Sequence, residues 1–418
     1  MCWLSNSCLF KPLGPTMFIS LVTETFYPDI NGVATTLTQL HAALLSAGHR
    51  VQVICPRADE SRVLDDGIEV PGFALPFYHS VRLGLPASGR LLKSWRQDRP
   101  DLVHVATEGP LGFSALRMAR RLGVPVTSSL HTNFHTYMTH YRVGWLANPV
   151  MRYLRWFHNR TALTFIPTDQ QASELGGMGF ERLTVLGRGV DTQLFNPDQR
   201  DSGLRNQWQQ MAGGQRVAEP LVALHVGRLA AEKNLDLLIA AFTAMRVARP
   251  DLVAVVVGDG PERARLERAL PWVVFVGMKR GEALARHYAS ADFFVFPSKS
   301  ETFGNVVLEA MASGLACISF NYAAGCRLIQ HGINGYLAAC DDEAGFIEIA
   351  EAISIQGVGS MGVRARHTAA AFDWGLITQT FEQHLRDVVA THATVVWTQP
   401  EAVHRAPGGL ASRGKPGG

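Results

Sequence analysis

The amino-acid sequence predicts an α/β fold built on two doubly wound parallel sheets. Short apolar runs alternate with helical patterns between residues 17 and 198, and the same alternation starts again at residue 221. The length of 418 residues agrees with two domains, because one hydrophobic core rarely serves more than about 250 to 300 residues. With 47% hydrophobic and 18% charged residues, the composition is that of a globular protein.

The first predicted domain covers residues 17–198. Its opening apolar run, Met17–Val22, is followed by a loop that contains Gly32 and then by leucines at helical spacing, so we expect a strand, a glycine loop and a helix. The other predicted strands are Val51–Cys55, Leu102–Ala106, Val124–Leu130, Leu163–Ile166 and Leu183–Leu186, and the other helices are Leu111–Leu122, Pro149–Asn159 and Asp169–Leu175. Because Met17 opens the first strand, we expect translation to start there and residues 1–16 to be a disordered leader.

The second predicted domain covers residues 221–373. It follows a polar stretch, residues 199–220, that we interpret as a linker with a helical piece. A last helix is expected over residues 374–392, and a disordered tail, rich in glycine, proline and arginine, over residues 398–418. The predicted strands of this domain are Leu221–Val226, Leu252–Val257, Val273–Val276, Phe293–Phe296 and Leu315–Ser319.

Charge and cysteine usage restrict the compartment and the partners. A formal net charge of +3 is too small to indicate nucleic-acid binding. No apolar run approaches the ~18 residues that a membrane-spanning helix needs. The six cysteines lack the Cys-x-x-Cys spacing of a zinc site and indicate reduced thiols, so we expect a cytoplasmic protein.

Residues 300–314 carry the most informative motif, Ser-Glu-Thr-Phe-Gly-Asn-Val-Val-Leu-Glu-Ala-Met-Ala-Ser-Gly. A predicted strand ends just before it, and apolar residues at helical spacing follow Gly304, so Glu301 is expected in a loop and Glu309 on a helix. The free N–H groups at the start of a helix attract phosphate. One carboxylate before that start and one inside the helix suit a sugar nucleotide, whose hydroxyls need acceptors and whose diphosphate needs donors.

The Glu-x7-Glu spacing with these neighbours resembles the signature of family-4 retaining glycosyltransferases, and the resemblance extends over about residues 17–390. It implies the B-type glycosyltransferase fold, in which two facing Rossmann-like domains hold the donor in a cleft and the final helix crosses back to the first domain. It also implies a metal-independent hexosyltransferase that needs no cofactor besides its nucleotide-sugar donor.

By the same resemblance, several residues would bind the donor. Gly32 would bring its loop to the diphosphate from the first domain. Glu309 would accept hydrogen bonds from both ribose hydroxyls. The backbone near Phe303, Gly304 and Asn305 would donate to the diphosphate.

The resemblance also implies four catalytic residues. Arg228 and Lys233 flank a predicted strand-to-helix turn and would stabilise the leaving diphosphate. Two bases at a helix start oppose the helix dipole unless an anion is bound, which favours this role. Glu301 would hold the sugar hydroxyls, and His131, at the carboxyl end of a predicted strand, would position the sugar for attack on the same face.

Rival functions fit the residues less well. The Gly-x-Gly at residues 258–260 lacks the third glycine of a dinucleotide-binding loop, because Arg263 stands there, and no phosphate-binding loop of the Gly-x4-Gly-Lys type occurs. His131 and His135 have no carboxylate near them, so we expect no metal site. A sugar-nucleotide 2-epimerase and a binding module with a vestigial site remain alternatives, and a donor-hydrolysis assay would separate them from a transferase.

The donor and the acceptor stay open at this point. The pattern Thr-Glu-Thr-Phe-Tyr-Pro at residues 23–28 resembles lipid-directed mannosyltransferases that use GDP-mannose, and a related branch uses UDP-sugars on diacylglycerol lipids. Residues 137–160 contain four arginines, six aromatic residues and no acid. Such a segment is typical of a helix at an anionic membrane surface, and we expect a lipid, lipid-linked or sugar acceptor there. The alternative is that its aromatic side chains pack into the domain core.

Overall fold

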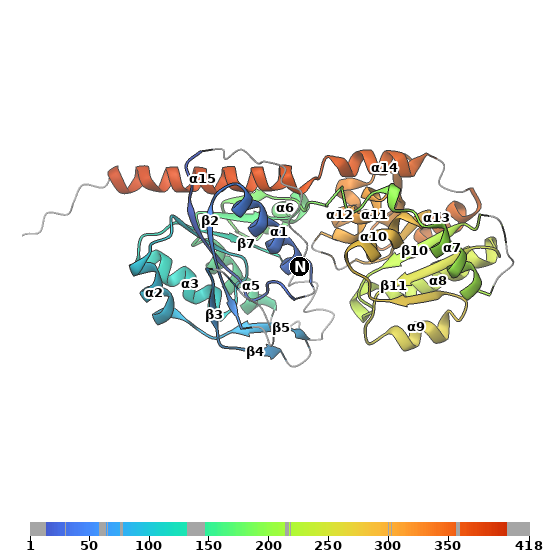
Figure 1. The fold of residues 1–418 in the computed structure, drawn as a ribbon, viewed down its shortest axis with the longest axis horizontal. Coiled ribbons are helices and arrows are strands. Elements are labelled where there is room, and N and C mark those ends of the chain that lie inside the picture. Colours follow the sequence, from blue (N-terminus) through green and yellow to red (C-terminus); the bar gives the residue numbers. More distant parts are fainter. Residues whose placement is uncertain are drawn as a thin grey trace, which may run out of the picture.

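The structure is a computed structural model that describes residues 14–29, 31–57, 64, 66–75, 78–131, 147–213, 217, 219–299, 301, 303–356 and 360–398. The chain forms two α/β lobes that lie side by side along the long axis of the molecule (Figure 1). Each lobe is built on a parallel sheet with helices on both faces, which confirms the predicted fold class.

The sheet of the first lobe has the strand order β3-β2-β1-β6-β7-β8-β9. Its central strand β1 lies between β2 and β6, so that Ile19 is paired with Val51 on one side and with Leu102 on the other. All of these pairs are parallel, so the carboxyl ends of the strands meet at one edge. The strands are β1 (Phe18–Val22), β2 (Arg50–Pro56), β3 (Ile68–Val70), β6 (Leu102–Val105), β7 (Val126–Ser129), β8 (Leu163–Ile166) and β9 (Leu183–Val185).

Helices cover both faces of this sheet. Leu37 of α1 and Phe381 and Leu385 of α15 belong to the core on one face, and Trp95 of α2 and Leu111 of α3 belong to the core on the other. Their apolar spacing follows the 3.6-residue period, which gives each helix one buried side. The helices are α1 (Gly32–Ser46), α2 (Ser88–Gln97), α3 (Pro110–Arg121), α5 (Ala147–His158) and α6 (Asp169–Gly177), with α15 (Trp374–Thr398) joining from the far end of the chain.

Four elements of the first lobe were not predicted. The short strand β3, the helix α2 and an antiparallel hairpin of β4 (Gly72–Leu75) and β5 (Tyr78–Gly84) all lie between β2 and β6. A three-residue strand has no measurable periodicity, and α2 has a low mean hydropathy because it buries only Leu91 and Trp95.

The sheet of the second lobe has the order β12-β11-β10-β13-β14-β15. Helices α10, α11 and α14 cover one face, and α8, α9 and α13 cover the other. The strands are β10 (Val222–Val226), β11 (Val253–Val257), β12 (Val274–Gly277), β13 (Phe293–Phe296), β14 (Ala316–Phe320) and β15 (Gly335–Ala338). The helices are α8 (Leu235–Ala248), α9 (Arg263–Ala269), α10 (Gly281–Ala289), α11 (Asn305–Ala312), α12 (Ala323–Leu328), α13 (Glu343–Gln356) and α14 (Met361–Ala370).

The stretch interpreted as a linker, residues 199–220, is folded onto the second lobe. After the 3₁₀ turn η2 (Pro197–Gln199), it forms helix α7 (Ser202–Met211), whose Trp208 is fully buried in the core of that lobe. Arg205 of α7 forms an ion pair with Asp292, at 3.1 Å from Nη2 to Oδ2. The polar composition of this stretch hid these apolar contacts, to which Leu204 and Ala212 also contribute.

The chain crosses between the lobes twice, and the two crossings are joined. The backbone N–H of Val190 donates to the carbonyl of Phe372 at 2.9 Å, and Val190 and Asp373 form an isolated parallel bridge. From there α15 runs back along the first lobe, as a C-terminal crossover helix should (Figure 1). Arg386 of α15 donates to the carbonyl of Pro15 at 2.6 Å, so residues 14–16 of the predicted leader are in contact with the fold.

Residues 1–13 of the leader and residues 399–418 of the tail lie outside the described residues. Thr398, the first residue of the predicted tail, is the last residue of α15. None of the described helices combines the length and the hydropathy needed to cross a membrane.

Candidate active site

The motif at residues 300–314 forms a turn between β13 and α11, as the sequence predicted. Gly304 is the N-cap of α11 and has a φ of +96°, in the left-handed region that favours glycine. A Cβ at this position would also lie 3.5 Å from the ring of Phe296. No side chain caps α11, so its first backbone N–H groups face the turn as donors for an anionic ligand.

Glu301 lies in the loop before α11 and forms an ion pair with Lys233. The same carboxylate oxygen accepts a hydrogen bond from Ser298 Oγ at 2.9 Å. Both side chains of the ion pair are largely buried, at 19% exposure for Lys233 and 17% for Glu301. Residues 68 positions apart are thus joined at the carboxyl edge of the second sheet.

Arg228 follows β10 and forms an ion pair with Glu232, one turn later in the chain. Glu232 is buried, whereas the Arg228 side chain is 42% exposed. Each of the two bases at this turn therefore has an acid partner, Glu232 for Arg228 and Glu301 for Lys233. Lys233 also ends the 3₁₀ turn η3 (Ala231–Lys233) ahead of α8, so the argument from the helix dipole does not support a bound anion here.

Glu309 lies on α11 and accepts a hydrogen bond from the hydroxyl of Tyr288, at 3.0 Å. Burial raises the pKa of Glu309 to about 7, and the Tyr288 hydrogen bond opposes that shift. Tyr288 belongs to α10 and is fully buried, so it holds the carboxylate from the core of the second lobe. A carboxylate fixed in this way offers an acceptor whose charge depends on pH near neutrality.

We expect Glu309 to reduce the stability of the unliganded protein at alkaline pH. Below the unfolded pKa of 4.5 the carboxyl is protonated in both states. Between pH 4.5 and about 7 only the unfolded state ionises, so the stability falls over this range and stays at the lower value above it. The shift sets an upper limit of roughly 3 kcal/mol for this loss. Glu309→Gln should therefore raise the free energy of unfolding more at pH 8 than at pH 5.5, measured by urea denaturation.

Glu348→Gln, on the exposed side of α13, is the matched control and should change neither value. Burial also raises the pKa of Glu24 to about 7, so some pH dependence will remain in the Glu309 variant. An identical dependence on pH in wild type and Glu309→Gln would contradict the expectation.

In the first lobe, Gly32 is the first residue of helix α1 and follows the N-cap Asn31. The Asn31 side chain accepts a hydrogen bond from the N–H of Ala34 at 2.9 Å. A Cβ at Gly32 would lie 3.7 Å from Nδ2 of Asn305 on α11. The glycine loop of the first lobe therefore faces the start of α11 across the space between the lobes. This placement is what a ligand held by both helix starts requires.

His131 follows β7 at the carboxyl edge of the first sheet and is 8% exposed. Its Nδ1 lies 2.6 Å from a guanidinium nitrogen of Arg188. Burial lowers the pKa of His131 well below its usual value, and the nearby charge of Arg188 lowers it further. The imidazole is therefore neutral at physiological pH.

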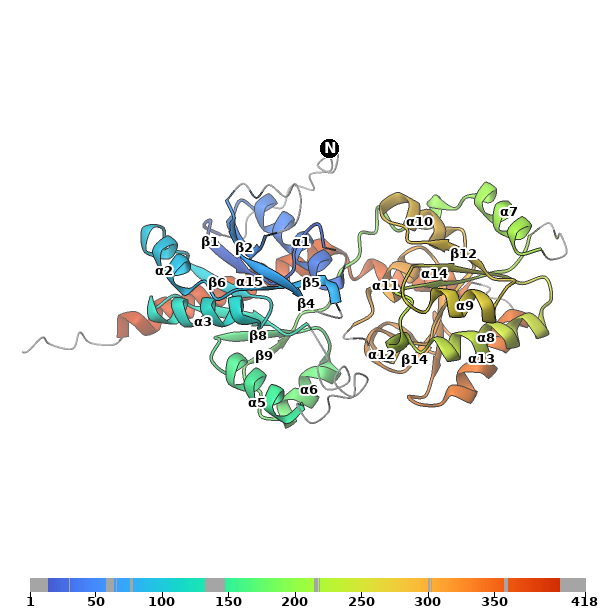
Figure 2. The same ribbon diagram turned by 90° about the horizontal axis from the view of Figure 1, so that it is seen from below.

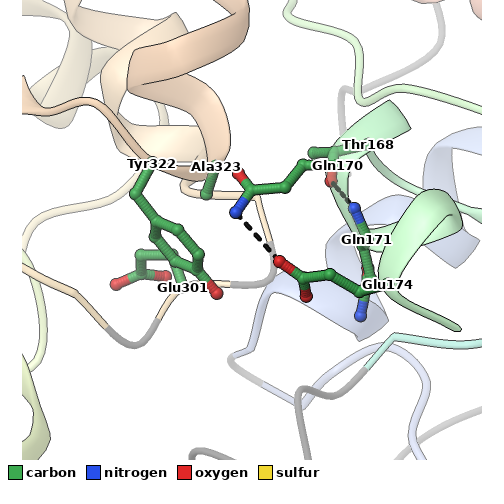
Figure 3. A pocket seen from close by; sticks show the side chains of 7 residues that line it. All are labelled: Thr168, Gln170, Gln171, Glu174, Glu301, Tyr322 and Ala323. Carbon is green, nitrogen blue, oxygen red and sulfur yellow. Dashed lines mark hydrogen bonds between the residues drawn. The ribbon is translucent and has the colours of Figure 1, made fainter. Parts of the chain in front are cut away.

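A pocket joins the two lobes beside Glu301 (Figure 3). Tyr322 and Ala323 line it from the second lobe, and Glu174 lies opposite on α6 of the first lobe. Its other lining residues are Thr168, Gln170 and Gln171, from the start of α6. A further contact between the lobes is the ion pair of Arg327 with Asp169, at 2.7 Å. Figure 2 shows the corresponding helices, α12 and α6, on the facing sides of the two lobes.

The structure thus gathers the predicted residues into two groups. Arg228, Lys233, Glu301 and Glu309 lie with Phe303, Gly304 and Asn305 at the carboxyl edge of the second sheet, and Gly32 and His131 lie at that of the first. Within the described part of the chain, no three His, Cys, Asp or Glu side chains are close enough together to hold a metal ion.

Sequence reasoning missed the residues that hold these groups. Glu232 could have been found, because it stands four positions after Arg228. Arg188 carried a weaker signal, as a lone arginine between two glycines after a strand. Tyr288 carried none, since it precedes Glu309 by 21 positions and meets it only in the folded core.

The aromatic and basic segment at residues 137–160 is only partly described, because residues 132–146 lie outside the described ranges. On α5, Phe157 is fully buried in the core, as the alternative of core packing predicts, so it is not part of a membrane surface. Arg155 donates to the carbonyl of Met178 at 3.0 Å. Trp156 remains 38% exposed, stacks on Phe113 at 5.8 Å between ring centroids, and lies under the Arg160 guanidinium at 4.3 Å.

Two family models match the chain. The model described as Glycosyltransferase Family 4 matches residues 30–194, and the model described as Glycosyl transferases group 1 matches residues 220–354. The two matches correspond to the first and the second sheet.

The chain is also similar to two curated proteins in sequence and to a solved structure in fold. A GDP-mannose-dependent alpha-mannosyltransferase of Mycolicibacterium smegmatis is 33% identical over 89% of this chain and 98% of its own. An alpha-monoglucosyldiacylglycerol synthase of Streptococcus pneumoniae is 28% identical over 72% of this chain and 71% of its own. The crystal structure of Anabaena HepE in complex with UDP has a TM-score of 0.70 at 19% identity and covers 89% of this chain and all of that one, which shows the shared fold.

Proposed function

Since the chain belongs to family 4 of the glycosyltransferases, we propose that it moves a mannosyl residue from GDP-mannose to a lipid, lipid-linked or sugar acceptor, with retention and therefore in alpha linkage. The observation that carries the proposal is the group formed by Lys233, Glu301 and Glu309 beside the uncapped start of α11. It combines a cation, two carboxylates and free N–H groups in one place. A nucleotide sugar presents the complementary diphosphate and hydroxyls.

Each group has a part in the proposed reaction. Glu309 accepts hydrogen bonds from the ribose hydroxyls and holds the nucleoside. Arg228, Lys233 and the N–H groups at Gly304 and Asn305 stabilise the charge that develops on the leaving diphosphate, a task that a metal ion performs in other enzymes. No metal is needed for this step in the proposal.

The sugar itself lies toward the first lobe in this account. Glu301 holds its hydroxyls, and Lys233 and Ser298 fix the carboxylate that does so. His131 Nε2 carries the proton, for the reason given below, and donates to a sugar oxygen. The acceptor enters from the first lobe and attacks on the face that the leaving diphosphate occupied.

The donor can be tested directly. GDP and GDP-mannose should raise the melting temperature of the purified protein more than UDP and UDP-glucose do. In a transfer assay, radiolabelled mannose should pass from GDP-mannose to diacylglycerol glycosides. A larger shift with the UDP compounds would favour the second candidate, a UDP-sugar-dependent glycolipid synthase. That candidate is supported by the likeness to the pneumococcal synthase. Release of a free epimerised sugar without transfer would instead indicate a 2-epimerase.

We also propose that the enzyme works at an anionic membrane surface, where a lipid acceptor would reside. The exposed ring of Trp156, with Phe113 stacked on it and Arg160 above it, gives α3 and α5 a shared aromatic and basic surface. Arginines near an anionic leaflet contribute about 1 kcal/mol each, and aromatic rings add interfacial burial.

Flotation with anionic liposomes tests the membrane proposal. Trp156→Ala combined with Arg152→Glu should weaken binding, because both side chains are exposed, and wild-type binding should fall as salt rises. Arg268→Gln, on the exposed side of α9 in the second lobe, is the control and should float as wild type does. Flotation of the double variant at the wild-type level, or no wild-type flotation on anionic vesicles, would leave a soluble sugar acceptor.

A further inference from the structure

Arg188 is a buried arginine between β9 and the first crossing of the chain. It is 6% exposed, and its Nη2 donates to His131 Nδ1 at 2.6 Å. Within the described ranges no carboxylate forms an ion pair with it, and burial alone lowers its pKa, to about 10. The guanidinium therefore stays charged at neutral pH without an acid beside it.

Two other shielded arginines of the chain have acid partners. Arg205 is paired with Asp292, and Arg386 with Glu382 at 2.7 Å. A buried charge is costly unless an opposite charge or several hydrogen bonds compensate it. Arg188 thus differs from these structural arginines in lacking an anion.

The contact with Arg188 also fixes the tautomer of His131. A guanidinium only donates hydrogen bonds, so Nδ1 of the neutral imidazole must be the acceptor and Nε2 must carry the proton. That Nε2 is buried and has no hydrogen-bond partner among the described residues. A second donor that lacks an acceptor in this part of the chain therefore lies beside a guanidinium that has no acid partner there.

The backbone holds Arg188 in place. A Cβ on the next residue, Gly189, would come within 2.5 Å of the Trp374 ring, so the chain packs directly on the start of α15. Val190 is then bonded to the carbonyl of Phe372 at 2.9 Å. These contacts fix the backbone from which the Arg188 side chain extends toward His131.

We propose that Arg188 and His131 form a subsite for an oxyanion of a substrate, a carboxylate or a phosphate, carried either by the transferred sugar or by the acceptor. Two donors on different elements, one of them charged, match a group with two adjacent oxygens. The donor diphosphate has its own groups on the second lobe, at Arg228, Lys233 and α11, whereas this subsite belongs to the first lobe. The inference rests on the proposed function and adds to it that one of the two substrates is acidic beyond the diphosphate.

The test compares kcat/KM within three pairs of substrates that differ in one acidic group. The donor pair is GDP-mannuronate with GDP-mannose. The first acceptor pair is octyl glucuronide with octyl glucoside, and the second is phosphatidylglycerol with diacylglycerol in mixed micelles. Wild type should prefer the acidic member of at least one pair by about tenfold or more, the contribution of one hydrogen bond between charged groups. The pair that shows the preference identifies the source of the oxyanion.

Arg188→Gln should abolish that preference, and Arg188→Lys, which keeps the charge, should retain part of it. Arg99→Gln should leave the preference for the acidic substrate unchanged. Thermal melting checks that each variant is folded. If Arg188→Gln does not fold, Arg188→Met takes its place. Absence of a preference in all three wild-type pairs, or an equal preference in Arg188→Gln, would overturn the proposal. So would a loss of GDP affinity as large as in Arg228→Ala, because Arg188 would then serve the diphosphate.

The test separates this inference from the proposed function. Transfer to neutral and acidic substrates at equal rates would leave the transferase intact and remove the subsite. If no pair supports transfer, the proposed function fails, and calorimetric binding within the same three pairs still decides the subsite. Tighter binding of an acidic member that depends on Arg188 would support it, and equal binding within all three pairs would refute it.

Discussion

Arg228→Ala and Lys233→Ala should each lower kcat by a factor of about 100 to 1,000, because each removes a donor to charge that develops on the leaving diphosphate. That factor corresponds to about 2.7 to 4 kcal/mol of transition-state stabilisation. The effect on donor affinity should be smaller, since the charge grows during the reaction. Steady-state rates with a saturating nucleotide sugar measure it.

The ion pairs require a control for these variants. Removing Lys233 takes the ion-pair cation from the Glu301 carboxylate, and removing Arg228 takes the ion-pair cation from the buried Glu232. Arg228→Ala with Glu232→Gln separates the loss of the cation from the loss of the ion pair. For Lys233, the double variant Lys233→Ala with Glu301→Gln is compared with Glu301→Gln alone, because Glu301 has its own part in the reaction. Rates near wild type in the first double variant, or near Glu301→Gln in the second, would show that the cation serves the fold and not the reaction.

Glu309→Ala should weaken binding of the bare nucleoside diphosphate by about tenfold to a hundredfold, the range of one or two hydrogen bonds to a charged group. Glu301→Ala should leave that binding nearly unchanged and lower kcat instead. The reason is position, since Glu309 lies inside α11 on the nucleoside side and Glu301 lies in the loop before the helix. Calorimetry with GDP distinguishes them, and equal losses of affinity in the two variants would refute the assigned roles.

Tyr288→Phe is the matched control for Glu309. It removes the hydrogen bond that opposes the rise in the pKa of Glu309, so the protonated form should persist to higher pH. If the ribose needs the carboxylate form, GDP affinity in Tyr288→Phe should reach its maximum at a more alkaline pH than in wild type. An unchanged pH profile would show that the protonation of Glu309 does not govern binding.

The fold could be predicted because buried parallel strands leave continuous apolar runs. The runs at residues 17–22 and 252–257 show this, and β1 and β11 are buried over nearly their whole length. The site motif could be predicted for a related reason, since the turn after β13 needs Gly304 and the two glutamates stand at a fixed spacing around it. Local sequence determines both features.

What could not be predicted depends on contacts between distant parts of the chain. Tyr288 contacts Glu309 only after the second sheet has formed, and the same is true of the ion pair between Lys233 and Glu301. On α5, Trp156 and Phe157 are neighbours of one chemical class, yet one is exposed and the other is core. Composition does not tell whether a side chain points into the core or to the solvent. Of the membrane surface expected from residues 137–160, only the exposed side of α5 therefore remains in the proposal.

The anomeric configuration of the first product tests the central claim most directly. Proton NMR should follow the purified enzyme with GDP-mannose, whose mannose is alpha-linked, and a diacylglycerol glycoside as acceptor. Retaining transfer at the Glu301 and His131 site predicts an alpha-mannoside as the first signal to grow, and growth of this signal about 100 to 1,000 times more slowly with the Lys233→Ala variant. A beta-linked first product, or a free epimerised sugar without a glycoside, would contradict the account.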